Sequence, residues 1–318
     1  MNRIKPQRPT LDRMKTIIHQ RTHIIILLAA AGAIPLAGAQ PASVSSIENS
    51  IEAKSPDSTY QAARALLKEN HGEDSVRKGF QMMLEAANQG YLPAIAGVAY
   101  LYNTGMGTPK DNAVAAKWFR IAAEKGHAIS QYNFGKVLVA DEIPLPDEVV
   151  DRKAQHEEGM EWIRKAADQG LDAAQSTYGI IILRGDFGTK PDATAASGYL
   201  KPAAEAGNLE AINALGMMHK TGNGVACDPG SSERLFRRAA MAGHVKAQAN
   251  LGEHLNPSSK NLDRRIEALA WLFIAEESKN VVAEKLLAPK LQVASPDEIA
   301  AAKKRAAEIK QEINGDKK

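Results

Sequence analysis

The fold of this chain is set by a short pattern, seen most clearly in Lys117-Trp118-Phe119-Arg120-Ile121-Ala122-Ala123-Glu124-Lys125-Gly126-His127. A small residue is followed by a bulky residue three positions later, then by Ala-Ala and a closing glycine. The instances are Gly79/Met82/Ala86/Ala87/Gly90, Ala115/Trp118/Ala122/Ala123/Gly126, Gly159/Trp162/Ala166/Ala167/Gly170, Ala196/Tyr199/Ala203/Ala204/Gly207 and Ser232/Leu235/Ala239/Ala240/Gly243. The closing glycines are spaced by 36, 44, 37 and 36 residues, and a degraded sixth copy ends at Lys279.

A second set of small residues keeps the same spacing. Four positions after each closing position stand Ala94, Ser130, Ala174, Ala211, Ala247 and Ala283, and five further on stand Ala99, Gly135, Gly179, Gly216 and Gly252. A repeat of this length predicts a helical hairpin: helix A, a glycine turn, helix B, and a glycine in the left-handed conformation that ends the helix. One hairpin cannot bury its apolar face alone, so neighbouring hairpins must stack.

The small residues let two helices approach closely, and the bulky residue is predicted to fill the space between repeats. We therefore expect Trp118, Trp162 and Trp271 to lie in the core. Helix-forming residues dominate the composition and aromatic residues make up only 5%, which also favours an all-α protein. The 44-residue step contains about eight extra residues, Asp141–Glu148, where Pro144 and Pro146 predict a non-helical loop.

This organisation resembles the Sel-1-like repeat family, a relative of the tetratricopeptide repeat. The segment from Ala211 to Gly216, the turn Gly222-Asn223-Gly224 and the run Arg238–His244 carry the resemblance most clearly. It implies a right-handed α/α superhelix of about six repeats over residues 58–290, followed by a capping helix and tail at 291–318. We expect that helix over about Pro296–Ile313. The family implies protein recognition rather than catalysis. Some exported members contain paired cysteines, whereas this chain has only Cys227.

The N-terminal segment has the features of an export signal. Residues 1–39 hold six of the 40 Lys and Arg but one of the 37 Asp and Glu. An apolar run from Ile24 to Leu36 follows and ends in Ala37-Gly38-Ala39, which predicts a cleaved signal peptide. An uncleaved anchor is the alternative, and Met14 is a second possible start. We interpret residues 40–57 as a flexible linker and expect no membrane span after cleavage.

The remaining chain offers no signature of a catalytic, metal or nucleic-acid site. Its net charge without residues 1–39 is −2, which gives no general attraction to nucleic acid. His127 and His244 follow closing glycines in equivalent repeats, so they indicate helix-end roles rather than a shared metal site. Asp111 and Asp228 precede B helices and are predicted N-caps. The glycine turns join two helices, unlike phosphate loops, and we expect no cofactor or metal.

These features predict a non-catalytic adaptor or regulator of the cell envelope, periplasmic or secreted, that binds a protein partner. A cell-wall hydrolase and a host-directed effector are the alternatives. By resemblance to tetratricopeptide arrays, the partner is expected on the A helices. The candidate groove residues are Tyr100, Asn103, Tyr132, Lys136, Asn213, Met217 and Lys220. The competing interpretation is that the two tyrosines only pack between neighbouring A helices.

Overall fold

The structure, a computed structural model, describes residues 55–68, 72–140, 151–255 and 260–315. They form two compact units that divide between Lys110 and Asp111. The first contains α3 (Pro56–Lys68), α4 (Glu73–Asn88) and α5 (Leu92–Thr104). The predicted signal peptide, nearly all of the predicted linker and the loop Asp141–Glu148 lie outside the described residues. Helix α3 begins just before the predicted linker boundary at residue 57.

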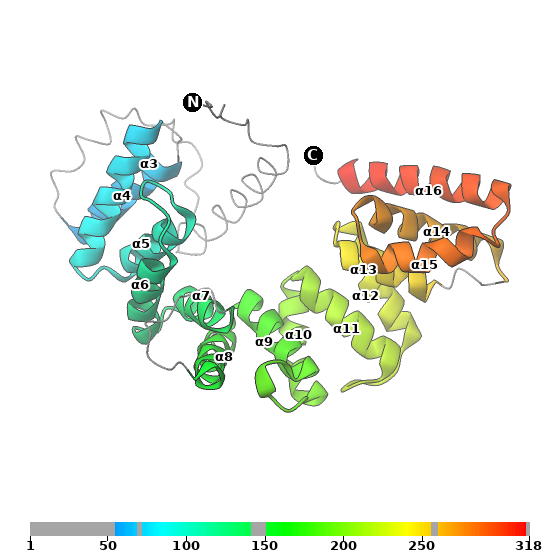
Figure 1. Cartoon of the computed structure of the whole chain (residues 1–318), viewed down its shortest axis with the longest axis horizontal. Coiled ribbons are helices and arrows are strands. Elements are labelled where there is room, and N and C mark those ends of the chain that lie inside the picture. The colour runs from blue at the N-terminus through cyan, green and yellow to red at the C-terminus, as the bar shows by residue number, and fades with distance from the viewer. Residues whose placement is uncertain (1–54, 69–71, 141–150, 256–259, 316–318) are drawn as a thin grey trace, which may run out of the picture. The chain divides into compact units, whose positions relative to one another are not determined.

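The second unit is a series of helices that follow one another along the chain (Figure 1). Its helices are α6 (Asn112–Glu124), α7 (Ala128–Val139), α8 (Arg152–Asp168), α9 (Asp172–Arg184), α10 (Ala193–Glu205), α11 (Leu209–Thr221), α12 (Pro229–Met241), α13 (Val245–His254), α14 (Leu262–Glu277), α15 (Val281–Leu291) and α16 (Pro296–Gly315), with a 3-10 turn η2 (Asp186–Gly188) after α9. No strand occurs in the four described ranges. The predicted all-α fold of helical hairpins is thereby confirmed. Six even-numbered helices, α4 to α14, are the B helices that carry the pattern.

Each B helix ends as the pattern predicts. The closing glycines all adopt positive φ, from 83° at Gly90 to 94° at Gly207. At Gly126 the backbone N–H groups of Gly126 and His127 donate to the carbonyl oxygens of Ala123 and Ala122 at 2.9 and 3.1 Å. Lys279 makes the same turn at φ 59°. The turn is therefore kept in the degraded repeat although its residue bears a Cβ atom, which the left-handed region disfavours.

The small-residue positions form the contact between the two helices of a hairpin. Ala94, Ser130, Ala174, Ala211, Ala247 and Ala283 are all 0% exposed. On α11, a Cβ atom at Gly216 would stand 2.6 Å from Cε1 of Phe236 on α12. Gly252 on α13 faces Leu272 on α14 in the same manner. Glycine is thus required at these positions because a large side chain of the B helix occupies the space of its missing Cβ.

The predicted burial of the tryptophans is correct for one of the three. Trp271 is 1% exposed, whereas Trp118 and Trp162 are only half-buried. The fully buried position of each B helix is the next residue along the chain: Met83, Phe119, Ile163, Leu200, Phe236 and Leu272, each at most 2% exposed. Adjacent residues on a helix point about 100° apart. One faces helix A of its own hairpin, and the other faces the gap between successive B helices.

Helix caps account for the polar residues near the turns. Asp111 accepts a hydrogen bond from the Val114 N–H at 2.9 Å, and Asp228 accepts one from the Ser231 N–H at 3.1 Å. Nδ1 of His127 and Nδ1 of His244 accept from the third N–H of α7 and α13, both at 3.2 Å. These contacts confirm the N-cap and helix-end roles. Burial lowers the pKa of His127, which keeps the neutral ring that can accept this bond.

The C-terminal helix α16 packs against α14. Its buried side consists of Ala302, Ala306, Ile309 and Ile313, which agrees with the predicted capping helix. Arg265 on α14 donates to Glu298 on α16 at 2.7 Å. Within the part of the chain that the structure describes, no helix has both the length and the apolarity needed to cross a bilayer.

Candidate functional site

The predicted groove residues are divided between the two units. Tyr100 and Asn103 lie on α5 of the first unit, and both are half-buried. Burial raises the pKa of Tyr100, so its phenol is neutral under all ordinary conditions. The other five candidates lie on α7 and α11 of the second unit.

One of the two α7 candidates touches the next A helix. The hydroxyl groups of Tyr132 and Thr177 on α9 are 3.0 Å apart. The Tyr132 ring packs against a buried cluster that includes Ile163 and Ile181. The Lys136 ammonium lies 5.4 Å from the centre of the Tyr132 ring and is exposed. Tyr132 thus takes part in packing between A helices, while Lys136 remains available to a partner.

The α11 candidates are also engaged with their neighbour, α13. Asn213 is 8% exposed, and its Oδ1 accepts a hydrogen bond from Asn250 at 2.7 Å. Nζ of Lys220 pairs with Oε2 of Glu253 at 2.6 Å. Met217 is half-buried against the core. A partner on this surface would have to share the Lys220 and Asn213 side chains with contacts that already join two A helices.

A groove lies elsewhere, between the B helices α10 and α12, with α11 as its floor. Its volume is about 340 Å³. The lining residues are Lys201, Ala204, Glu205, Leu215, His219, Ser231, Arg234, Leu235 and Arg238. The lining therefore contains three basic side chains and a histidine but only one carboxylate, that of Glu205. Its apolar part includes Leu215 and Leu235.

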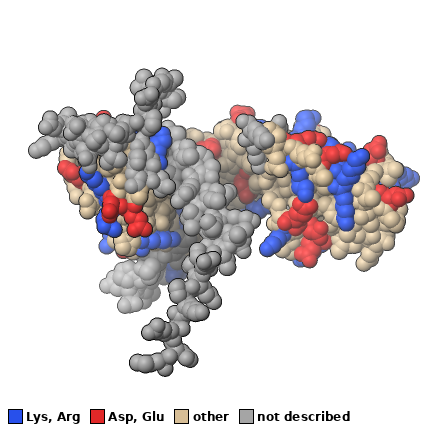
Figure 2. All heavy atoms as spheres, turned by 90° about the horizontal axis from the view of Figure 1, so that it is seen from above, with Lys and Arg blue, Asp and Glu red and all other residues tan. Residues whose placement is uncertain are grey.

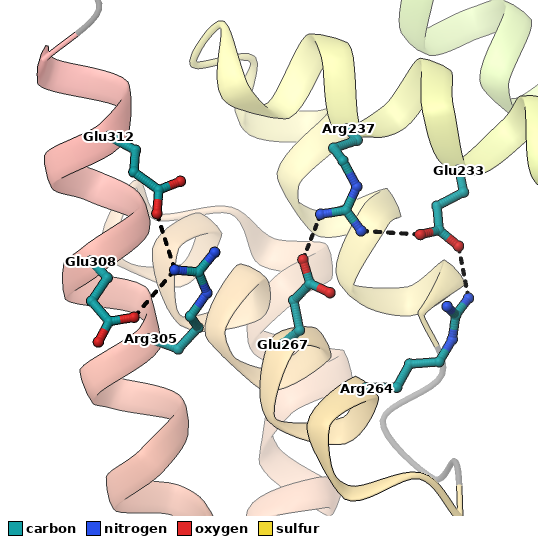
Figure 3. Close-up of polar contacts among 7 residues, drawn as sticks. All are labelled: Glu233, Arg237, Arg264, Glu267, Arg305, Glu308 and Glu312. Atoms are coloured by element: carbon teal, nitrogen blue, oxygen red, sulfur yellow. Dashed lines mark hydrogen bonds and ion pairs between the residues drawn. The ribbon is translucent and has the colours of Figure 1, made fainter.

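Two of the three cations that line this groove have no ion pair in the part of the chain that the structure describes. The third, Arg234, lies close to Asp228, and it adds to the hydrogen bonds from Ser231 that lower the pKa of that carboxyl. Among the described residues, neither Lys201 nor Arg238 forms an ion pair with a carboxylate, and Nη2 of Arg234 donates to the Ser231 hydroxyl at 2.7 Å. The surface nearby differs. Over the C-terminal helices drawn in Figure 2, Lys and Arg side chains lie beside Asp and Glu side chains. In Figure 3, Arg237 lies between Glu233 and Glu267, at 3.0 and 2.5 Å.

The groove residues are not among the candidates predicted from the sequence, although one of them, Lys201, belongs to a recurring set of cations. Arg120, Arg164, Lys201 and Arg237 all stand six positions before a closing glycine. A recurring cation at one repeat position marks a defined place on the fold. Lys201 differs from the three arginines in residue type and in having no ion pair among the described residues.

The remaining candidate features are a possible metal site, the cysteine and one strained turn. In the four described ranges, no three His, Cys, Asp or Glu side chains gather in a way that could hold a metal ion. Cys227 is exposed in the turn between α11 and α12, with Sγ 3.8 Å from the Lys220 carbonyl oxygen. Phe187 adopts φ 55° in η2, and its ring centre lies 5.0 Å from that of His156 on α8.

The Sel1 repeat pattern matches residues 71–91, 92–127, 150–171, 172–208 and 209–244. These spans coincide with α4, α5–α6, α8, α9–α10 and α11–α12. The chain is a Sel1 repeat protein. The Sel1 repeat scaffold is one that generally mediates interactions between proteins and is typically non-catalytic.

Solved Sel1 repeat proteins share this fold. The structure of c5321, described as a protective antigen of uropathogenic Escherichia coli with an SLR fold, is 25% identical. It superposes with a TM-score of 0.67 over 84% of this chain and 56% of the other. A Sel1 repeat protein from Oxalobacter formigenes is 24% identical, with a TM-score of 0.62 over 78% of this chain and 96% of the other.

Curated relatives have a similar level of sequence identity. An uncharacterized protein of Neisseria meningitidis, NMB1327, is 24% identical over 73% of this chain and 52% of its own length. The chitin synthase regulator SKT5 of Saccharomyces cerevisiae is 23% identical over 60% of this chain and 28% of its own. The chain thus spans about half, or less, of the length of these relatives.

Proposed function

We propose that this Sel1 repeat protein is an exported, non-catalytic adaptor or regulator that binds a protein partner in the cell envelope, in the periplasm. The α10–α12 groove is the observation that supports this function most directly. It places arginine, lysine and leucine side chains together on an exposed surface, a mixture typical of protein-binding sites, where arginine contributes strongly to affinity. The exposed Lys136 offers a second contact on the A-helix side.

The leader sequence supports the proposed location. Its basic start, apolar run and Ala37-Gly38-Ala39 site have the arrangement of a signal peptide. N-terminal sequencing of the protein from a periplasmic fraction should give Gln40 as the first residue. A chain that still begins at Met1 or Met14, or that stays in the cytoplasm, contradicts export, and recovery from the medium changes the location to secreted.

Capture of partners from the envelope fraction, followed by mass spectrometry, tests the adaptor role. We expect a protein that is retained at physiological salt and that binds the purified chain in a two-component assay. Incubation with purified peptidoglycan is the companion measurement, because turnover of that material would overturn the non-catalytic role.

The A-helix surface is tested with Tyr100→Ser and Tyr132→Ser in one chain whose helical circular dichroism matches the parent. If these tyrosines contact the partner, its affinity should fall at least tenfold. Unchanged binding would leave the tyrosines with a packing role and place the partner on another surface.

A further inference from the structure

The α10–α12 groove is one of four equivalent gaps between successive B helices in the second unit. The gaps lie between α6 and α8, α8 and α10, α10 and α12, and α12 and α14. The first B helix of each gap carries a cation six positions before its closing residue. The second B helix carries a side chain eight positions before its own closing residue, and this side chain occupies the gap. The cations are Arg120, Arg164, Lys201 and Arg237, and the filling side chains are Trp162, Tyr199, Leu235 and Trp271.

In three of the four gaps an aromatic ring occupies the filling position. Trp162 meets Phe134 on α7, with ring centres 5.9 Å apart. Tyr199 meets Tyr178 on α9 at 4.9 Å. Trp271 is buried in the core of the last gap. Only in the α10–α12 gap is the filling side chain aliphatic. Leu235 lies beside Leu215 there, and the smaller volume of leucine leaves the groove open.

In the same three gaps the cation is neutralised inside the chain. Arg120 pairs with Glu124 at 2.9 Å. Arg164 pairs with Glu161 and Asp168 at 2.7 and 3.1 Å.

Arg237 pairs across its gap with Glu267 of α14 (Figure 3). Lys201 has no such pairing in the described residues, and Arg234 and Arg238 of α12 add two more positive charges beside it.

The neighbouring gaps also indicate what the open one would accept. Glu267 and Trp271 stand four residues apart on α14, and Glu158 and Trp162 have the same spacing on α8. The indole N–H of Trp162 donates to Glu158 at 3.2 Å. On α12 the corresponding positions are Ser231 and Leu235. On α10 they are Ala195 and Tyr199. The groove therefore lacks the carboxylate and the aromatic ring of the α6–α8 and α12–α14 gaps, and the aromatic ring of the α8–α10 gap.

We propose that the α10–α12 groove binds a helix of a partner protein that presents an acidic side chain and an aromatic side chain four residues apart. The carboxylate would pair with Lys201 and Arg238, and the ring would cover Leu215 and Leu235. This inference rests on the proposed function as a protein-binding adaptor. It supplies the chemistry of the partner: an acidic, aromatic amphipathic helix, whose side chains four apart share one face.

The test uses the full chain and a fluorescent peptide with the sequence of α8, Arg152–Asp168, which carries Glu158 and Trp162. Fluorescence anisotropy should show saturable binding that weakens with added salt. The matched control peptide carries Glu158→Lys and Trp162→Ala and should bind at least tenfold more weakly.

Two variants of the protein locate the site. Lys201→Glu with Arg238→Glu reverses the groove charge, and we expect about a tenfold loss of peptide affinity. Lys117→Glu with Lys125→Glu makes the same change of net charge at exposed positions of the α6 region and should leave the affinity unchanged.

Leu235→Tyr restores the aromatic filler of the neighbouring gaps. Tyr199 donates its hydroxyl to Asp168 at 2.9 Å, and Glu205 holds the position equivalent to Asp168. The new ring should close the groove and abolish peptide binding without lowering the unfolding midpoint, so loss of binding cannot be attributed to misfolding.

Absence of peptide binding to the parent, or equal binding by the parent and both groove variants, overturns the groove proposal. The adaptor function fails separately, when no envelope protein binds the purified chain. If an envelope protein binds the parent and the groove variants equally, the adaptor function is supported and only the proposed groove site is wrong.

Discussion

Two neighbouring gaps, α10–α12 and α12–α14, have the same arrangement of helices but different side chains between them. Both are floored by an A helix, and both lie above the same glycine contact, Gly216 with Phe236 in one and Gly252 with Leu272 in the other. The second is filled by Trp271 and joined by an ion pair. The first holds Leu235, and its cations Lys201 and Arg238 have no ion pair within the described residues. Packing of the repeats thus depends on a few positions, such as the glycines, that are the same in each repeat. Residues at other positions form internal contacts in one repeat and exposed surface in another.

The largest expected effect comes from the filled gap. Trp271→Ala should lower the free energy of unfolding by about 3–5 kcal/mol, because it empties a fully buried site. Leu235→Ala in the open gap should cost only about 1–2 kcal/mol, since that side chain is half-exposed. Urea unfolding followed by circular dichroism measures both. Equal losses would show that the two gaps contribute alike to stability.

The shared glycine contact should respond equally in both gaps. Gly216→Ala and Gly252→Ala should each cost about 1–3 kcal/mol, because the added methyl group meets Phe236 or Leu272. Gly198→Ala is the control: Gly198 lies in α10 with open space around its Cβ position, so alanine should stabilise by about 0.5–1 kcal/mol. A gain of stability at Gly216 would mean that the helices can separate at no cost.

The end of α14 allows a smaller, stabilising change. Lys279 adopts φ 59°, where every other described B helix closes with glycine. Lys279→Gly should raise the free energy of unfolding by about 0.5–1 kcal/mol by removing that strain. Lys285→Gly inside α15 is the matched control and should lower it by a similar amount. A fall in the melting temperature of Lys279→Gly would show that the lysine side chain itself stabilises the turn.

The ion-pair network of the filled gap should make its stability depend on pH. Burial acts to raise the pKa of Glu233, but hydrogen bonds from Arg264 and Arg237 outweigh burial and hold it below its ordinary value. Such a carboxylate stabilises the fold above its unfolded pKa, and the contribution is lost as pH falls through its folded pKa. Glu233→Gln should therefore lose less stability than the parent between about pH 5 and about pH 3.

Melting temperatures across this range test the effect, with Glu205→Gln in the open groove as the control. A parent and a Glu233→Gln variant with the same pH profile would remove Glu233 from the acid response.

Much of this architecture could be predicted from sequence because small residues and turn glycines are needed at fixed places. Ala94, Ala211 and Gly243 lie as their spacing requires, buried or in the left-handed conformation. Side-chain burial next to the bulky position was harder to predict. Trp118 and Phe119 are adjacent and both large, so their spacing does not show which faces helix A.

For the candidate site, too, some features follow from the sequence and others only from the tertiary structure. The sequence alone determined the repeat, its register, the helix ends and the recurring cation of the B helices, because each follows from local backbone geometry or from close helix contact. Only the tertiary structure decided that Tyr132, Asn213 and Lys220 contact neighbouring A helices, and that the space beside Leu235 stays open. Those outcomes depend on which side chains from other repeats reach the same space, and this is a property of packing across repeats rather than of any one of them.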